Sequence, residues 1–278
     1  MRWGLARGIA ALVVTLLIAL AGPASAAPKA ELWSRWMAHD PQSGLTVDHS
    51  AWDGLLTAYV RQGDDGINRV AYGRFPDVDR AALDRYVSRL AATPVSRLAR
   101  TEQLPFWINL YNALTLQVVL RHYPVDGIRD IDISPGLFAD GPWGKKLVTI
   151  EGAPVGLDDI EHRILRPVWK DPRIHYAVNC ASLGCPNLRI EAFTAENTDR
   201  LLETAARDYI NHPRGARVAD GKLMVSRIYD WFEADFGGTD ETVIAHLKRY
   251  AEGALKNALG KVRKIDGYAY DWSLNDAR

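Results

Sequence analysis

The chain has 278 residues with 34 basic and 34 acidic side chains, so its formal net charge at pH 7 is zero. This balance excludes the strongly basic surface typical of nucleic-acid-binding proteins, and the length allows one large domain or two small ones. Only two cysteines occur, and these allow at most one disulfide within the chain.

Residues 1–26 have the pattern of a secretory signal peptide. Arg2 and Arg7 form a positively charged start, an apolar run covers residues 9–21, and the small residues 24–26 form a cleavage site. The apolar run is shorter than the roughly 18 residues of a membrane-spanning helix. We therefore expect an exported protein of 252 residues, periplasmic or secreted, with a net charge of −2 and no membrane span.

A lead-in segment is predicted for residues 27–47, and a single globular domain is predicted for residues 48–278. The first amphipathic helices are expected at 50–61 and 77–90, because apolar side chains recur there every three or four residues. A loop rich in Asp and Gly lies between them and leads into an expected strand at 67–72.

The most apolar helix is predicted for residues 104–122. Eleven of the fifteen residues in 106–120 are apolar, and Asn109, Asn112 and Thr115 form one narrow polar stripe. A helix that is apolar nearly all round lies in the core. Buried amides need partners, because an unpaired one costs about 1–3 kcal/mol. We expect Asn109 and Asn112 either to bond to neighbouring backbone or to face a site.

Several short elements are predicted next. A loop rich in Gly and Pro covers residues 125–143, and a β-hairpin is expected at 146–155 with its turn at Glu151-Gly152. A short helix is expected at 157–165. A strand is predicted at 174–178, because its residues are β-branched, aromatic or apolar.

The last part of the chain combines helices with paired strands. Helices are predicted at 194–212 and 239–259, and an Asp220-Gly221 turn predicts a hairpin across 217–225. A second strand pair is expected at 262–274. Helices dominate and strands come in antiparallel pairs, which is typical of an α+β protein.

The stretch 171–186 contains both cysteines and a histidine, and it is the candidate site. His175 and Cys180 are predicted as base and nucleophile, because a nearby base favours the reactive thiolate. Glu161, on the preceding helix, is predicted to orient His175. On a straight strand His175 and Cys180 would point to opposite faces, so their approach requires a turn. The alternative is a structural disulfide between Cys180 and Cys185.

Three further side chains are candidates for substrate binding. They are Asn109 and Asn112 on the central helix and Arg173 beside His175, although Arg173 would also suit pairing with surface carboxylates. No metal or other cofactor is expected. The Cys-x4-Cys spacing matches no zinc pattern, and the sequence contains no glycine-rich phosphate loop, serine nucleophile elbow or zinc-protease motif.

The chain resembles the domain-of-unknown-function family number 547 over roughly residues 48–275. The resemblance rests on Glu-Gln-Leu-Pro-Phe-Trp-Ile-Asn-Leu-Tyr-Asn-Ala-Leu-Thr (102–115), Leu-Asp-Asp-Ile-Glu-His-Arg-Ile-Leu-Arg (157–166), Asp-Pro-Arg-Ile-His-Tyr-Ala-Val-Asn-Cys (171–180), the following Cys-Pro, residues 226–236 and Tyr-Asp-Trp-Ser-Leu (270–274). It implies kinship with papain-like and transglutaminase-like folds, in which a central buried helix packs on an antiparallel sheet. In those folds the nucleophilic cysteine begins the central helix, where this chain has none.

Two functions follow as expectations. The first is a thiol-dependent amide hydrolase or acyl-transferase, with Cys180 as nucleophile, His175 as base and Glu161 as the orienting group. The second is a non-catalytic envelope binding module with a Cys180–Cys185 disulfide and an aromatic cleft near Trp143 and Trp231. The expected partner in either case is a small molecule or a peptide, and not a nucleic acid.

Overall fold

The computed structural model describes residues 28–136 and 140–277. The predicted signal peptide lies outside these residues. Within the described ranges, no helix has the length and apolar character needed to cross a membrane.

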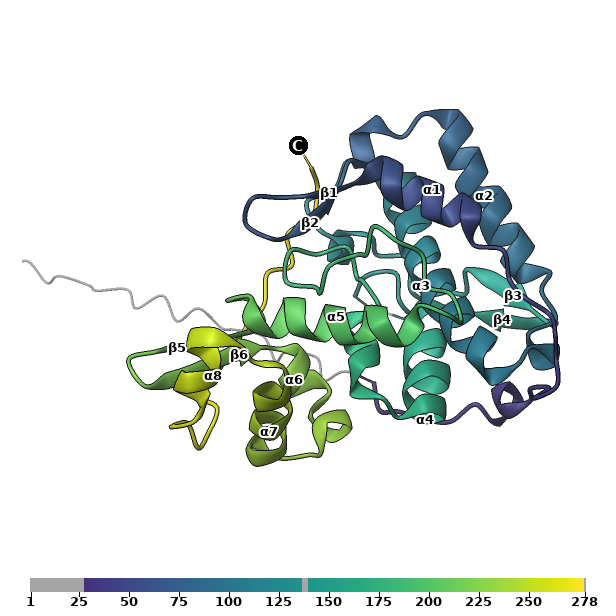
Figure 1. Ribbon diagram of the computed structural model, residues 1–278. Helices are drawn as coiled ribbons and strands as arrows, with labels where there is room; N and C mark the ends of the chain where they lie inside the picture. Colours follow the sequence, from purple (N-terminus) through teal and green to yellow (C-terminus); the bar gives the residue numbers. More distant parts are fainter. Residues whose placement is uncertain (1–27, 137–139, 278) are drawn as a thin grey trace, which may run out of the picture.

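The α+β class is confirmed, with eight α-helices and seven short strands in the described part of the chain (Figure 1). The helices are α1 (Ser50–Tyr59), α2 (Asp77–Ala91), α3 (Arg100–His122), α4 (Arg166–Trp169), α5 (Thr198–Asn211), α6 (Ile228–Trp231), α7 (Asp240–Tyr250) and α8 (Gly253–Leu259). The strands are β1 (Val60–Gln62), β2 (Asn68–Val70), β3 (Val148–Ile150), β4 (Ala153–Val155), β5 (Ala216–Ala219), β6 (Lys222–Ser226) and β7 (Gly267–Ala269).

The central helix is α3, and every residue from Pro105 to Leu120 is buried, as the sequence predicts. The helix begins at Arg100, four residues earlier than expected. Tertiary contacts hold this extra turn, because the Gln103 amide donates to the carbonyls of Ala38 and Val95. The helix ends before Pro124, since a residue that precedes proline favours an extended backbone.

The sheets are small and separate, which differs from the single antiparallel sheet expected beside the central helix. Strands β1 and β2 form one hairpin, β3 and β4 form another, and β5, β6 and β7 form a three-stranded sheet. Helix α3 packs mainly on α2 and on a π-helix at Asp159–Leu165. The core around α3 is therefore built chiefly from helices.

Both predicted hairpins with a two-residue turn are confirmed. Glu151-Gly152 joins β3 to β4, and Asp220-Gly221 joins β5 to β6. All four turn residues have positive φ, between 46° and 77°. This conformation matches the twist of the paired strands and explains why the Gly at the second position is informative.

The predicted strand at 174–178 is wrong, because His175 lies on a 3₁₀-helix, Pro172–Tyr176. Asp171 caps this turn by accepting a hydrogen bond from the Arg173 backbone N–H at 2.9 Å. Pro172 at its first position has the φ that such a turn needs. The apolar run reflects burial on all sides and not an extended backbone.

Three predictions fail in the C-terminal part. The long helix expected at 239–259 is two helices, because the backbone is extended at Ala251 and Gly253 has a φ of +50°. Helix α5 begins at Thr198 because Thr194 and Asn197 close a turn before it. The strand pair expected at 262–274 is the single strand β7, which runs parallel to β6.

Two clusters of buried apolar side chains make up the core. The larger surrounds α3, and the smaller lies among β5, β6 and helices α6 to α8. Helix α5 lies between the two groups of elements (Figure 1). It gives Leu201 and Leu202 to the first cluster and Tyr209 and Ile210 to the second.

Candidate functional site

The two cysteines form a disulfide, Cys180–Cys185. The loop that it closes is fixed by the C-terminal segment, because Leu183 N–H donates to the Ser273 carbonyl and Gly184 N–H to the Asp271 carbonyl, both at 2.8 Å. Gly184 allows this approach, since a Cβ there would lie 2.8 Å from the Asp271 nitrogen. The loop therefore has little freedom to move away from the chain end.

The surroundings of the two sulfur atoms are unequal. Cys180 is half-buried, whereas Cys185 is only 4 % exposed. The Cys180 backbone N–H donates to Cys185 Sγ at 3.0 Å. The Tyr270 hydroxyl lies 3.0 Å from Cys180 Sγ and 3.1 Å from Cys185 Sγ. Burial raises the pKa of Tyr270, so its hydroxyl keeps its proton at neutral pH and remains able to donate.

His175 lies in a buried network of charged groups. Its Nε2 is 2.7 Å from Asp235 Oδ2, and its Nδ1 is 3.7 Å from Glu161 Oε1. The Arg166 Nε also donates to Asp235 Oδ2, at 2.5 Å. The Phe232 ring stacks on the imidazole with a centroid distance of 4.1 Å. Glu161 and His175 are thus brought together, as the sequence predicts, but with Asp235 as a second carboxylate.

The contacts within this network favour the charged forms of its buried side chains. Burial opposes ionisation of His175, but the Asp235 and Glu161 carboxylates outweigh it and raise its pKa. Burial likewise opposes the charge on Glu161, while His162, His175 and Arg166 lower its pKa to about 2. The pKa of Asp235 also falls to about 2 through His175 and Arg166, despite burial. The two carboxylates thus favour the protonated form of the imidazole.

Cys180 and His175 have different partners in this structure. The sulfur contacts Ser182, Tyr270 and Cys185, while both imidazole nitrogens face carboxylates. No hydrogen bond joins the two residues. The structure thus contains a disulfide beside a histidine network, and Tyr270, rather than His175, contacts the sulfur atoms.

The two asparagines of α3 bond to backbone. Asn109 donates to the Phe193 carbonyl and accepts from the Phe193 N–H. Asn112 donates to the Ala177 carbonyl and accepts from the Asn179 N–H, at 2.9 and 2.8 Å. Asn112 thus fastens the His175–Cys180 stretch to the central helix, and Asn109 fastens the later segment at Phe193. Bonding to backbone is one of the two roles that the sequence allows.

Arg173 lies among surface carboxylates. Its guanidinium pairs with Asp171 at 2.7 Å, Asp199 at 2.9 Å and Glu203 at 3.6 Å. These contacts link the 3₁₀-helix to α5, whose first turn contains Asp199. The arginine thus makes the surface ion pairs that the sequence offers as the alternative to substrate binding.

Sequence reasoning missed Tyr270 and Asp235 as members of the site. Tyr270 lies in the Tyr-Asp-Trp-Ser-Leu run that carries part of the family resemblance, which is the one signal that could have found it. Asp235 follows an aromatic segment, and its pairing across 60 residues to His175 is visible only in three dimensions.

Aromatic side chains gather beside the disulfide. Trp143 and Trp231, expected to line a cleft, both pack on Trp272, with centroid distances of 5.9 and 5.4 Å. Trp231 also packs on Tyr270 at 4.8 Å. The neighbouring carboxyl group of Asp158 has a pKa raised to about 6, by burial first and then by Glu161 and Asp159. The aromatic rings are all half-buried.

A cavity of about 470 Å³ lies on another side of Tyr270. The disulfide loop contributes Leu183 and Gly184 to its wall, and the guanidinium-bearing side chains are Arg69, Arg214 and Arg217. Asp65 pairs with Arg69 at 2.6 Å. The cavity therefore presents two further arginines close to the disulfide.

No cluster of three or more metal-ligating side chains occurs in residues 28–136 and 140–277.

Comparison with protein families gives one match. Residues 95–210 match the family described as "Protein of unknown function, DUF547". The matched segment contains α3, the Glu161 helix, the 3₁₀-helix with His175, and the disulfide. Comparisons with curated proteins and with solved structures find no match for the chain.

Proposed function

We propose that this chain, which belongs to the DUF547 family through residues 95–210, is an exported protein that exchanges its Cys180–Cys185 disulfide with thiols. The unequal surroundings of the two sulfur atoms are the observation that carries the proposal. Cys180 is accessible to an incoming thiolate, and Cys185 is buried among hydrogen-bond donors.

The contacts of Cys185 favour it as the leaving group. A thiolate leaves faster when its pKa is low, and hydrogen bonds to the charged form lower that pKa. The Cys180 N–H and the Tyr270 hydroxyl are placed to donate to a Cys185 thiolate. The disulfide therefore opens preferentially by attack at Cys180.

The exchange begins when a thiolate of a partner dithiol attacks Cys180 Sγ. The bond to Cys185 breaks, its electron pair remains on Cys185 as a thiolate, and a mixed disulfide with Cys180 forms. The second thiolate of the partner then attacks the partner's own sulfur and releases Cys180 as a thiolate. The partner is oxidised to a disulfide and Cys180 and Cys185 are reduced.

The test uses two single-cysteine variants treated with oxidised glutathione and weighed intact. Cys185→Ser should form a mixed disulfide at Cys180, while Cys180→Ser should remain unmodified in the folded state. In a variant that keeps both cysteines, Tyr270→Phe should slow reduction of the Cys180–Cys185 disulfide by dithiothreitol about tenfold. Equal modification of both variants, or a disulfide that resists reduction until the protein unfolds, would refute the proposal and favour the non-catalytic binding module.

The second candidate is a thiol-dependent amide hydrolase or acyl-transferase that acts after the disulfide is reduced. It is favoured by the carboxylates that flank His175, since a carboxylate orients the catalytic histidine in Ser-His-Asp triads. The Cys180 thiolate would add to the amide carbonyl, and the imidazolium would give its proton to the leaving amine.

Labelling by an electrophilic amide probe separates the two candidates. In the hydrolase, His175→Gln should abolish labelling of Cys180 in the reduced protein and in the Cys185→Ser variant. In the exchange protein, that substitution should leave the rate of mixed-disulfide formation at Cys180 unchanged. Near-ultraviolet circular dichroism provides the control that the variant keeps its fold.

A further inference from the structure

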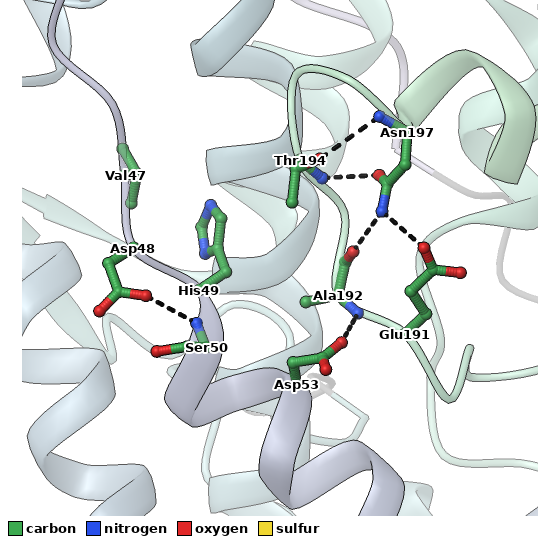
Figure 2. Close-up of a pocket in the computed structure, with 9 residues that line it drawn as sticks. All are labelled: Val47, Asp48, His49, Ser50, Asp53, Glu191, Ala192, Thr194 and Asn197. Atoms are coloured by element: carbon green, nitrogen blue, oxygen red, sulfur yellow. Dashed lines mark hydrogen bonds between the residues drawn. The ribbon is translucent and has the colours of Figure 1, made fainter.

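A second cavity, of about 460 Å³, is lined by residues from two segments of the chain, 47–53 and 191–197. It opens between the segment that enters α1 and the loop that precedes α5 (Figure 2). Asp48, His49 and Asp53 line one side, and Glu191 and Thr194 line the other. No motif in the sequence predicts it, and it shares no lining residue with the cavity at the disulfide.

The imidazole of His49 is the unusual group in this cavity. The residue is only 4 % exposed. Its Nδ1 lies 2.6 Å from the Tyr86 hydroxyl, whereas its Nε2 is buried and has no hydrogen-bond partner among residues 28–136 and 140–277. Figure 2 shows the ring projecting away from α1 into the space between Val47 and Thr194.

The contact with Tyr86 decides what Nε2 offers. Burial lowers the pKa of His49 to about 4, so the ring is neutral at pH 7. A phenol is a stronger donor than a neutral imidazole, and the described residues offer the Tyr86 hydroxyl no other acceptor, so it donates to Nδ1. The ring proton is then on Nε2. A buried donor without an acceptor costs about 1–3 kcal/mol, so this N–H favours a ligand that accepts.

The remaining polar wall is acidic. Asp53 Oδ1 accepts from the Ala192 N–H at 2.8 Å, Asp48 Oδ1 from the Ser50 N–H at 2.9 Å, and Glu191 Oε1 from Asn197 Nδ2 at 2.9 Å (Figure 2). Among the described residues, no donor contacts the second oxygen of Asp53 or of Glu191, whereas Asp48 bonds to both the backbone and the side chain of Ser50. The lining contains no lysine or arginine, although Arg200 pairs with Glu191 from outside it.

We propose that this cavity binds the amino terminus of a short peptide, with the ammonium group on the carboxylates and the first carbonyl oxygen on His49 Nε2. A primary ammonium supplies three donors and the positive charge that the acidic wall attracts. The adjacent carbonyl is the acceptor that the Nε2–H needs. Among the described residues, no metal-ligating cluster includes these side chains, so an organic cation fits better than a metal ion.

The probe is alanyl-alanine amide, whose binding to the full chain is measured by isothermal titration calorimetry. Its N-acetylated form, which lacks the ammonium, should bind at least tenfold more weakly. Putrescine, which has ammonium groups but no carbonyl, should also bind at least tenfold more weakly. No binding of alanyl-alanine amide, or equal affinity for either of the other compounds, would overturn the proposal.

Substitutions locate the binding without relying on one residue. Asp53→Asn and Glu191→Gln keep an amide oxygen for their backbone and Asn197 contacts but lose the charge, and each should weaken binding at least tenfold. His49→Phe keeps a ring and loses the donor, with a similar expected loss. Glu203→Gln removes a carboxylate on α5 outside the cavity and should leave the affinity unchanged. If Glu203→Gln weakens binding as much as Asp53→Asn, the site is not this cavity.

Discussion

His175 and His49 are buried to the same degree, each with 4 % of its surface exposed, yet their pKa values move in opposite directions. Burial opposes the charge on His175, but the Asp235 and Glu161 carboxylates outweigh it and raise the pKa of His175. A tyrosine hydroxyl is the hydrogen-bond partner of His49, whose pKa falls to about 4 because burial dominates.

The difference separates a structural network from a recognition site. The carboxylates beside His175 favour its charged form, and its Nδ1 faces the Glu161 carboxylate at 3.7 Å although it has no hydrogen-bond partner among the described residues. His49 is neutral, and its Nε2 has no hydrogen-bond partner in the part of the chain that the structure describes. Burial alone therefore says little about the role of a histidine, whereas the partners of each ring nitrogen say much.

The largest expected effect on stability comes from a substitution that breaks the hydrogen-bond network of His175. Asp235→Asn removes the carboxylate that His175 and Arg166 share, and leaves two buried cations with less compensation. We expect the free energy of unfolding at pH 7 to fall by about 3–5 kcal/mol in urea titrations. Asp208→Asn, in a surface pair with Arg189, is the matched control and should change it by less than about 1 kcal/mol. Equal losses would mean that the network adds no stability of its own.

Acidification should act on His49 in the opposite sense to His175. Because the folded pKa of His49 is below its unfolded value of 6.5, the unfolded chain takes up the proton first. Protonation of His49 should therefore lower the free energy of unfolding by about 3 kcal/mol as pH falls from 6.5 to 4. Above pH 7 it should leave the free energy of unfolding unchanged. Unfolding of the native chain and of His49→Gln, compared across this range, measures the difference. A parallel decline in both proteins would contradict the assignment.

Reduction of the disulfide should affect the stability of the protein but not ligand binding in the His49 cavity. A short loop closed by a disulfide contributes about 2 kcal/mol through the entropy of the unfolded chain. We expect the reduced protein to be less stable by this amount in denaturant, with its affinity for alanyl-alanine amide unchanged, because the His49 cavity shares no lining residue with the disulfide loop. A loss of peptide affinity on reduction would show that the two regions are coupled.

The smallest expected effect concerns the hydroxyl that positions His49. Tyr86→Phe removes the donor to Nδ1 and should lower the free energy of unfolding by about 1 kcal/mol. The ring proton is then free to move between the nitrogens, which should appear as a change in the imidazole nitrogen shifts in NMR spectra. Tyr268→Phe is the control, since the Tyr268 hydroxyl makes no hydrogen bond with the described residues. The same nitrogen shifts in the Tyr86→Phe variant and the native protein would contradict the proposed tautomer.

Much of the candidate site follows from local sequence. The proximity of Glu161 to His175 and the bond between Cys180 and Cys185 concern residues close together along the chain. Asp235 and Tyr270 join the same place from 60 and 90 residues away. Sequence spacing contains no information about such distant pairs, and for this reason it does not predict that Tyr270 contacts the sulfur atoms.

The sequence by itself determined the elements whose signals are local: the apolar stretch of α3, the amphipathic helix α2, and the two turns with Gly at the second position. Only the tertiary structure decided the rest. The Asp171 carboxylate caps the 3₁₀-helix that contains His175. The Asp266 carboxylate accepts a hydrogen bond from the Leu223 N–H, and this contact helps to place β7 parallel to β6. Side-chain capping and long-range backbone pairing compete with local propensity by only a few kcal/mol, so the surrounding fold settles the outcome.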